Sequence, residues 1–388
     1  MSENSVATTV GVPRRRRGTG RVGTALLVNL LAVTLGLLGG VVVIAATGLD
    51  VGPAVSAIIT GAFGSAGALR ETLRQAVPIL IGGLGVSYGL RAGLFNIGGE
   101  GQIYIGALVA VVVALAVPGL GPVVVLAAGM LGGALWGGAA GAMRAWLRMD
   151  EVITTILLNF VAFWGVSYAV NGPLKDPNSS GYPWTVQVAE SVRLGSLPLG
   201  PVRVPVGLLI GLIAAIAVAV VIGRTRHGME LRLVGTSRSA ATFAGVPVRR
   251  RQFQALAASG ALAGLAGAVE LIGAQLRLSD FFSPSYGFTA IAVALVGNAN
   301  PYGCVAAALA FGALRAGAAS MERVAQVPVA ISLVVQGVII IALILVRSPV
   351  VMRLLTDRLS LLAPRRATVT GAPDAGHDAA ERAGEGTT

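Results

Sequence analysis

The stretch RAGLFNIGGEGQIYIG, residues 91–106, lies between two apolar runs but has the wrong composition for an ordinary membrane helix. Its four internal glycines weaken helical order. Asn96, Glu100 and Gln102 bring polar groups to the edge of a hydrophobic segment. Irregular backbone at membrane depth survives only inside protein or beside a water-filled cavity. The stretch therefore predicts a broken helix that lines a translocation path. The alternative is a tight turn between two helices, with Glu100 among the lipid headgroups.

The composition indicates a polytopic helical membrane protein. Of 388 residues, 55% are hydrophobic and 12% are charged, whereas soluble domains carry about 25% charged residues. The apolar runs are long and continuous, unlike the alternating segments of about ten residues in a membrane β-barrel. We therefore expect an all-α fold of about ten transmembrane helices, some of them broken or re-entrant.

Residue usage argues against an enzyme. Cys304 is the single cysteine, which excludes a disulfide framework and a cysteine metal site. His227 lies in a basic loop and His377 in the C-terminal tail, without partners placed for a metal cluster or a catalytic triad. The only lysine, Lys175, precedes an aspartate, so no phosphate-binding GK[ST] loop exists. We expect no catalytic residue, no metal and no cofactor bound by this chain.

The apolar runs divide the chain into three parts. Residues 1–23 predict a basic cytoplasmic tail, residues 24–347 a transmembrane domain, and residues 348–388 a largely disordered cytoplasmic tail. Residues 172–203, rich in proline and glycine, predict an outer loop, and the aromatics of residues 275–287 (Phe281, Phe282 and Tyr286) predict an interfacial belt. The expected spans are 24–47, 74–90, 101–117, 122–143, 151–171, 204–223, 254–274, the short second broken segment 288–297, 302–319 and 327–346.

Charge distribution sets the expected orientation. With both termini inside, most arginines fall on the cytoplasmic side, including the runs Arg14 to Arg17 and Arg224 to Arg251. This bias follows the rule that cytoplasmic loops of membrane proteins are enriched in lysine and arginine. It also accounts for the net charge of +12 without a nucleic-acid partner.

Two patterns predict how the helices pack. Glycines recur every four residues at 133, 137 and 141, and again at 260 and 264, which is typical of closely packed membrane helices. GAMRA at 141–145 also resembles GALRA at 312–316, and the polar pair Thr155 and Asn159 matches Ser332 and Gln336. The match suggests an inverted repeat of spans 2–5 and 7–10, with a site near the midplane.

The basic segment 224–253, here called the coupling loop, contains a short predicted helix. Thr236 or Ser237 can cap its start, and Gly245 followed by Pro247 gives a stop signal. Phe243 is its only large apolar side chain and suits docking on a partner protein. The alternative is an ordinary basic loop in which the helix is incidental.

Several stretches, taken in order, resemble a known family: GLRAGLFNIGGEGQIYIGA, DEVITTILLNF, GMELRLVGTSRSAATFAGVPVRRRQF, SGALAGLAGAVE and GFTAIAVALVGNANPYG. They are similar to permease subunits of bacterial ABC importers for nucleosides and simple sugars, a group related to the branched-chain amino-acid permeases. The nucleoside branch is the nearest, and the resemblance covers roughly residues 24–346. It implies a multi-pass permease of the bacterial cell membrane that moves substrate by alternating access.

The resemblance also implies partners. These are a cytoplasmic ATPase that binds ATP and Mg²⁺, a second homologous permease forming a heterodimer, and an external substrate-binding lipoprotein. Residues 228–247 match the segment that docks on the ATPase, which gives the coupling candidates Glu230, Gly235, Ser237, Ala241, Phe243 and Gly245. Polar residues near the expected breaks and spans give the substrate-pathway candidates Asn96, Glu100, Gln102, Asn159, Asn298, Asn300 and Gln336.

Two other functions fit parts of the pattern. A ribose-like sugar permease would use the same uncharged donors and acceptors. An ion-coupled secondary transporter would fit the broken helices, although Glu100 and Glu270 are the only obvious intramembrane acids for coupling. We expect Glu100 to pair either with an arginine such as Arg91 or with backbone N–H groups.

Overall fold

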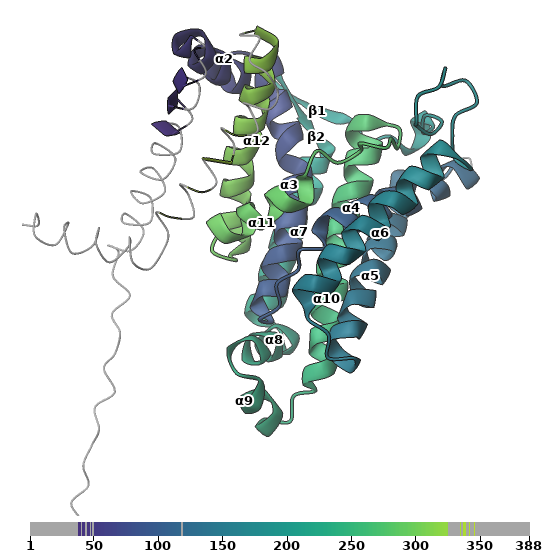
Figure 1. The fold of residues 1–388 in the computed structure, drawn as a ribbon, viewed down its shortest axis with the longest axis vertical. Helices are drawn as coiled ribbons and strands as arrows, with labels where there is room; N and C mark the ends of the chain where they lie inside the picture. Colours follow the sequence, from purple (N-terminus) through teal and green to yellow (C-terminus); the bar gives the residue numbers. More distant parts are fainter. Residues whose placement is uncertain are drawn as a thin grey trace, which may run out of the picture. The chain divides into compact units, whose positions relative to one another are not determined.

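The computed structural model describes residues 50–324 apart from Pro118, together with isolated residues within 38–48 and 334–345. Both predicted tails, most of the first and last predicted spans, and Gln336 lie outside the described residues. Helices dominate the described chain, as Figure 1 shows. They are α2 (Val51–Phe63), α3 (Ala66–Arg91), α4 (Gly99–Ala116), α5 (Pro122–Trp146), α6 (Glu151–Asn171), α7 (Val206–Arg224), α8 (Arg226–Thr236), α9 (Arg238–Phe243), α10 (Val248–Glu270), α11 (Tyr286–Val296) and α12 (Pro301–Val324).

The described helices confirm a polytopic membrane fold. Six of them are long and apolar enough to cross a membrane, and α2 with α3 would make a seventh if this pair, bent by 80°, is one span. The six are α4, α5, α6, α7, α10 with its π-helical extension, and α12. Within the described residues the predicted count of ten is not reached.

Helix α3 begins earlier than the predicted span 74–90. Ser65 caps it by accepting a hydrogen bond from the N–H of Ala68 at 3.0 Å. Its first turns carry Arg70, Glu71 and Arg74, which interrupt the apolar pattern. The hydropathy of the sequence therefore placed the start of the span too late. An ion pair between Arg74 and Glu71 offsets the charge there.

Two breaks interrupt the helical backbone. Between Arg91 and Gly99 the chain leaves the helix, with Gly93 in the left-handed region at φ 68°, and this confirms the predicted break. The second break follows the π-helix Leu271–Gln275 (η2), where Leu276 and Ser285 have φ 60° and 62°. The 11 residues of α11 then rise about 16 Å at 1.5 Å each, too little to cross a core of about 30 Å.

Closely spaced glycines form the centre of the helix packing. A Cβ added to Gly137 would meet Gly260 Cα at 2.9 Å, and one added to Gly264 would meet Gly133 Cα at 2.8 Å. Helices α5 and α10 therefore touch backbone to backbone, as the four-residue spacing predicted. Helix α10 also packs against α3 and α4, which places it beside the first break.

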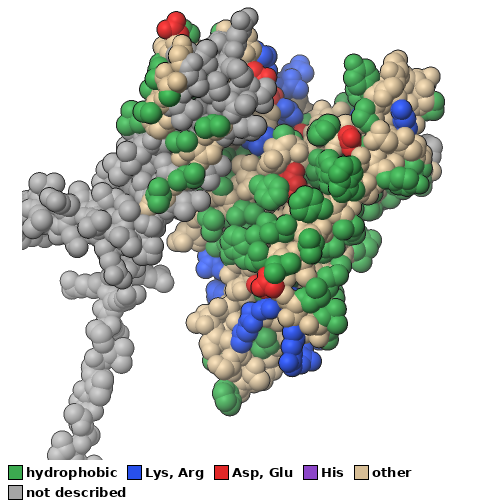
Figure 2. All heavy atoms as spheres, viewed as in Figure 1, with side chains coloured by type: hydrophobic (Ala, Val, Ile, Leu, Met, Phe, Trp, Pro, Cys, Tyr) green, Lys and Arg blue, Asp and Glu red, His purple; other side chains and the backbone are tan. Residues whose placement is uncertain are grey.

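The segment predicted as an outer loop holds structure that the sequence did not predict. Strand β1 (Ser196–Leu199) pairs antiparallel with β2 (Val202–Pro205), and a short 3₁₀ helix spans Glu190–Val192. Prolines within and beside these strands concealed them, because proline is unusual inside a sheet. Figure 1 shows this hairpin and the α8–α9 segment at opposite ends of the helices. On the face drawn in Figure 2, apolar side chains cover the middle, and basic ones lie toward both ends, including the end with α8 and α9.

Candidate translocation and coupling site

Side-chain amides hold the first break in shape. The Asn96 Nδ2 group donates to Gln102 Oε1 at 2.9 Å and to Ser259 Oγ at 2.8 Å. Asn96 Oδ1 accepts from the N–H of Gly98 at 2.9 Å. All four residues are buried, and buried polar groups are costly unless paired. Asn96 thus links the non-helical backbone to Gln102 of α4 and to Ser259 of α10.

Helix α6 supplies the remaining support for this break. Asn159 Oδ1 accepts from the Gly101 N–H at 2.8 Å, and its Nδ2 donates to the carbonyl of Ile97 at 3.0 Å. Thr155 Oγ1 accepts from the Ile97 N–H at 3.3 Å. Asn159 therefore ties the last residues of the break to the first turn of α4. The sequence had singled out Thr155 only for its place in the possible repeat.

Glu100 joins the two breaks. It lies in the first turn of α4, and its carboxylate accepts from the Gly287 N–H of α11 at 2.6 Å. The hydroxyl of Ser283 and the N–H of Phe288 also face this carboxylate. The predicted pairing of Glu100 with backbone N–H groups is confirmed, and the alternative pairing with Arg91 is wrong. Arg91 instead donates to the carbonyl of Ala299, at 2.6 Å from NH2 and 3.0 Å from Nε.

The N-termini of α4 and α11 therefore meet inside the protein. A Cβ added to Gly287 would meet Glu100 Cα at 2.5 Å, so the two backbones are in direct contact. The N-terminus of a helix carries a partial positive charge of about half a unit. Two such ends beside each other favour a negative group between them, and Glu100 provides it. Broken helices that meet in this way are typical of midplane transport sites.

Asn298 and Asn300 lie elsewhere, in the exposed turn between α11 and α12. Asn298 adopts φ 55°, and Asn300 Oδ1 accepts from the N–H of Tyr302 at 3.0 Å, which caps α12. The Ala299 carbonyl between them binds Arg91, at the end of α3. The structure thus groups Asn96, Glu100, Gln102 and Asn159 at the start of α4, and places these two asparagines in a separate turn.

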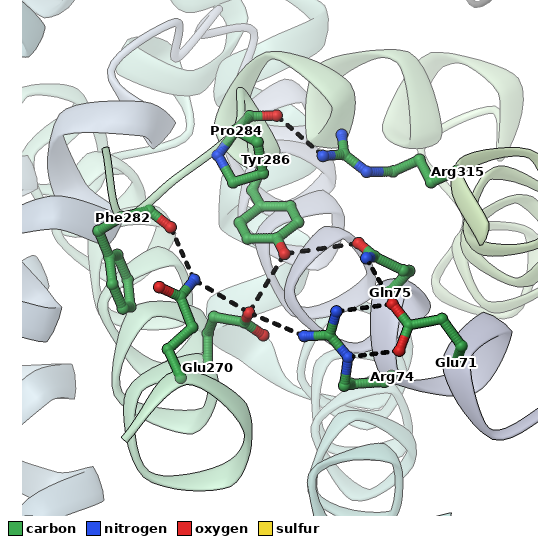
Figure 3. Close-up of polar contacts among 9 residues, drawn as sticks. Glu71, Arg74, Gln75, Glu270, Phe282, Pro284, Tyr286 and Arg315 are labelled. Carbon is green, nitrogen blue, oxygen red and sulfur yellow. Dashed lines mark hydrogen bonds and ion pairs between the residues drawn. The ribbon is translucent and has the colours of Figure 1, made fainter. Parts of the chain in front are cut away.

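A second polar cluster, which the sequence did not predict as a unit, links α3, α10 and the second break (Figure 3). Arg74 lies 2.6 Å from Glu71 and 3.4 Å from Glu270. Glu270 also accepts from Tyr286 Oη at 3.2 Å and from Gln275 Nε2 at 3.2 Å. A buried acid needs such partners, because an unpaired buried charge is strongly destabilising.

Arg315 completes this cluster from α12. It donates to the carbonyl of Pro284 at 2.9 Å and stacks over the ring of Tyr286 at 4.9 Å. Tyr286 and Phe282 are buried, whereas Phe281 is 81% exposed. The predicted interfacial belt is therefore wrong for Phe282 and Tyr286, because the second break folds them inward. In the sequence, the signals for this cluster were two charged residues within apolar runs, Glu270 and Arg315.

The coupling loop contains two short helices, α8 and α9. Ser237 caps α9 by accepting from the N–H of Ala240 at 3.3 Å, while the hydroxyl of Thr236 donates back to the Arg232 carbonyl. Gly245, at φ 74°, follows the helix end as predicted. Ala241 is fully buried, whereas Phe243 is 93% exposed. Phe243 is thus a large apolar side chain left exposed on a short helix.

Glu230 anchors α8 to the membrane helices. Its nearly buried carboxylate accepts from Arg226 Nε at 2.8 Å and from Arg251 Nε, on α10, at 2.7 Å. Hydrogen bonds from Arg226 and Arg251 lower the pKa of Glu230, so the group is charged at neutral pH. Gly235 lies against the backbone of Arg91, Ala92 and Gly93, at the start of the first break.

The chain has membrane-crossing helices, two breaks whose helix ends meet inside the protein, and a capped loop at one end. Together these features define a membrane transport protein. The family described as branched-chain amino acid transport system / permease component matches residues 68–344. The chain belongs to this family.

Curated relatives match over most of their length. A guanosine ABC transporter permease, NupP of Bacillus subtilis, is 36% identical over 86% of this chain and 96% of its own. A glucose ABC transporter permease, TsgB13 of Haloferax volcanii, is 36% identical over 83% of this chain and 87% of its own. A nucleoside ABC transporter permease, NupB of Lactococcus lactis, is 31% identical over 81% of this chain and 89% of its own. No solved structure matches the chain.

Proposed function

We propose that this chain is the permease subunit of an ABC importer that carries nucleosides across the bacterial cell membrane. The proposal rests on family membership over residues 68–344 and on two relatives named for guanosine and nucleoside transport. In this proposal the meeting point of α4 and α11 would form the site near the bilayer midplane that alternating access requires.

The proposed machine needs other subunits. A cytoplasmic ATPase would bind ATP and Mg²⁺ and dock on the coupling loop, where Phe243 is exposed. A second homologous permease would complete the path as a heterodimer, and an external lipoprotein would deliver substrate. In this arrangement both termini lie in the cytoplasm, on the side of the basic coupling loop. Reading frames next to this gene that encode these three proteins would support the assembly.

Within the permease, Asn96, Glu100, Gln102 and Asn159 would form the wall of the path at the first break. A nucleoside is neutral and polar, so amide groups suit it better than charged ones. Asn298 and Asn300 would line the cytoplasmic exit, beside the end of α3. Gln336, outside the described residues, stays in the proposal on its sequence position alone.

Uptake in living cells tests the substrate. Cells with and without this gene are given labelled guanosine, uridine, adenosine, ribose or glucose in separate assays. We expect the gene to raise uptake of at least one nucleoside, and an excess of unlabelled nucleoside to remove the signal. Glucose is the second candidate, since one relative of equal identity carries that name. Saturable glucose or ribose uptake, with nucleoside uptake unchanged by the gene, would overturn the nucleoside assignment.

A further inference from the structure

The coupling loop meets the first break where the backbones of Gly235 and Gly93 lie against each other. A Cβ added to Gly93 would meet Gly235 Cα at 3.0 Å and its carbonyl oxygen at 3.2 Å. A Cβ added to Gly235 would meet Gly93 N at 2.9 Å and Ala92 C at 3.0 Å. Two glycines are needed here because the end of α8 lies directly on the end of α3. Movement of one backbone is therefore transmitted to the other without passing through a flexible side chain.

Two polar links hold α8 in this position. Glu230 of α8 binds Arg251 of α10, and His227 Nε2 lies 2.8 Å from the hydroxyl of Tyr88 on α3. Arg251 NH1 also lies 2.6 Å from His227 Nδ1. Arginine can only donate, so Nδ1 accepts and the proton lies on Nε2, which donates to Tyr88. Burial and the charge of Arg251 lower the pKa of His227, so this neutral form persists at cytoplasmic pH.

The far end of the break leads to the proposed path. Residues 92–98 lead from Gly93 to Asn96, whose side-chain amide binds Gln102 and Ser259 and accepts from the Gly98 N–H. Glu100 follows in the first turn of α4. Glu100 in turn contacts α11. A continuous chain of contacts thus runs from the exposed Phe243 segment, through α8 and the break, to the point where the two half-helices meet.

We propose that Gly235 and Glu230 are positioning residues of the transport cycle: Gly235 passes movement of the coupling loop to the first break through Gly93, and Glu230 keeps α8 against α10 during that movement. This rests on the proposed function, because the movement comes from the ATPase. It assigns Gly235 and Glu230 to the relay within the permease, whereas Phe243 makes the contact with the ATPase.

The test uses the complete importer in proteoliposomes and measures two quantities, substrate imported and ATP hydrolysed. In Gly235→Ala the added methyl group separates α8 from the break. We expect transport to fall about tenfold, while the ATPase still co-purifies and ATP hydrolysed per substrate imported rises. Gly223→Ala is the matched control, since a Cβ at this exposed glycine of α7 meets nothing within 4 Å. It should transport normally.

A second variant tests the anchor. Glu230→Ala should raise the ATP consumed per substrate in the same way, and Glu230→Gln, which keeps the shape and one acceptor oxygen, should restore part of the coupling. Arg226→Gln is its control. Arg226 binds the same carboxylate from the exposed face of α8, and its loss leaves the link to α10 in place.

The outcomes separate this inference from the proposed function. Normal transport in Gly235→Ala, or loss of ATPase binding together with transport, would overturn the relay while the wild-type importer still works. If transport and ATP hydrolysis fell by the same factor, the relay would also be overturned. A folding defect lowers both in proportion, because it reduces the amount of active importer. An absence of ATP-driven uptake in the wild-type complex would instead refute the proposed function.

Discussion

Glu100 is an acid held mainly by the first backbone groups of another helix. Its charge lies beside the N-termini of both α4 and α11, and each such contact is worth about 0.3–1 kcal/mol. Glu100→Gln keeps the acceptor oxygen and removes the charge. We expect the purified permease to lose about 1 kcal/mol of stability and transport to fall.

Thermal unfolding in detergent and an uptake assay measure these two effects. Glu190→Gln is a suitable control, because Glu190 is an exposed acid of the outer loop paired with Arg193. A Glu100→Gln variant that assembles and transports like the wild type would show that the charge has no role.

Asn159 makes two of the contacts by which α6 supports the first break. Asn159→Ala leaves the Gly101 N–H and the Ile97 carbonyl without their partner, although an interhelical hydrogen bond in a membrane is worth only about 0.6 kcal/mol. We expect transport to fall further than the amount of folded permease, because the break would lose its shape while the bundle remains. Uptake normalised to membrane-inserted protein gives the comparison.

Asn171→Ala is the control on the same helix, where the side chain only binds the Ser167 carbonyl at an exposed end. Equal losses of folded protein and of transport in Asn159→Ala would mean that Asn159 acts purely in helix packing.

At the residue scale the sequence predicted candidates better than it predicted their partners. Asn96, Glu100, Gln102 and Asn159 stood out because polar groups inside apolar runs are rare and cluster at interiors. The Arg74–Glu270 pair could not be recognised, because these residues are 196 positions apart and nothing local indicates the contact. Tyr286 and Phe282 suggested a belt, since aromatic residues near span ends usually lie at the interface.

Among the elements, α9 is the one expected to contact another protein. Phe243→Asp would place a charge where an apolar side chain is exposed, and burying that charge against a partner is unfavourable. We expect the permease to fold normally, since the loop lies outside the bilayer, and the ATPase to dissociate with a sharp fall in transport. Co-purification of the ATPase with wild-type and variant permease measures this.

Thr242→Asp is the charge control, because Thr242 is the exposed polar neighbour of Phe243 on the same helix. Its complex should keep most of the ATPase. Full retention of both ATPase and transport in Phe243→Asp would exclude α9 as the docking contact.

Elements with strong local signals were predicted, and those that depend on distant contacts were not. Ser237, Gly245 and Pro247 are sufficient to delimit α9, because capping and stop signals act within a few residues. The break at 92–98 was visible in its glycines. The β1–β2 hairpin was missed because its prolines imitate a loop, and the start of α3 was missed because Glu71 and Arg74 are stabilised by pairing with each other and with Glu270.

For the whole molecule, we expect the glycine contact between α5 and α10 to be important for stability. Gly133→Ala would bring a Cβ against Gly264 Cα at 2.6 Å, and overpacking of this kind costs about 1–3 kcal/mol. We expect less folded permease in the membrane and a lower unfolding temperature. Quantitative immunoblotting and thermal unfolding of the purified chain measure both.

Gly165→Ala tests helix propensity alone, since a Cβ there meets nothing within 4 Å. It should be neutral or slightly stabilising, because alanine favours helix over glycine by about 0.5–1 kcal/mol. If Gly133→Ala were equally harmless, α5 and α10 would have to be farther apart than the structure places them.

The fold class followed from composition, because long apolar runs in lipid can only be helices. The glycine spacing indicated that α5 and α10 each pack closely against another helix, and the structure shows that they pack against each other. The arrangement of α4 against α11 did not, because a helix end leaves no periodic pattern that identifies its partner. The possible inverted repeat stays a prediction, since Ser332 and Gln336 lie outside the described residues.

The meeting of Glu100 with Gly287 also restricts how this protein can evolve. When two side chains form an ion pair, a mutation in one can be compensated by a change in the other. Here the donor is a backbone N–H, and Gly287 has no room for a side chain. A lineage that loses the acid at position 100 therefore cannot recover it by exchanging charges with residue 287. Reversion at position 100 restores the acceptor directly, and Ser283, whose side chain already faces the same carboxylate, is a neighbouring position for a new one.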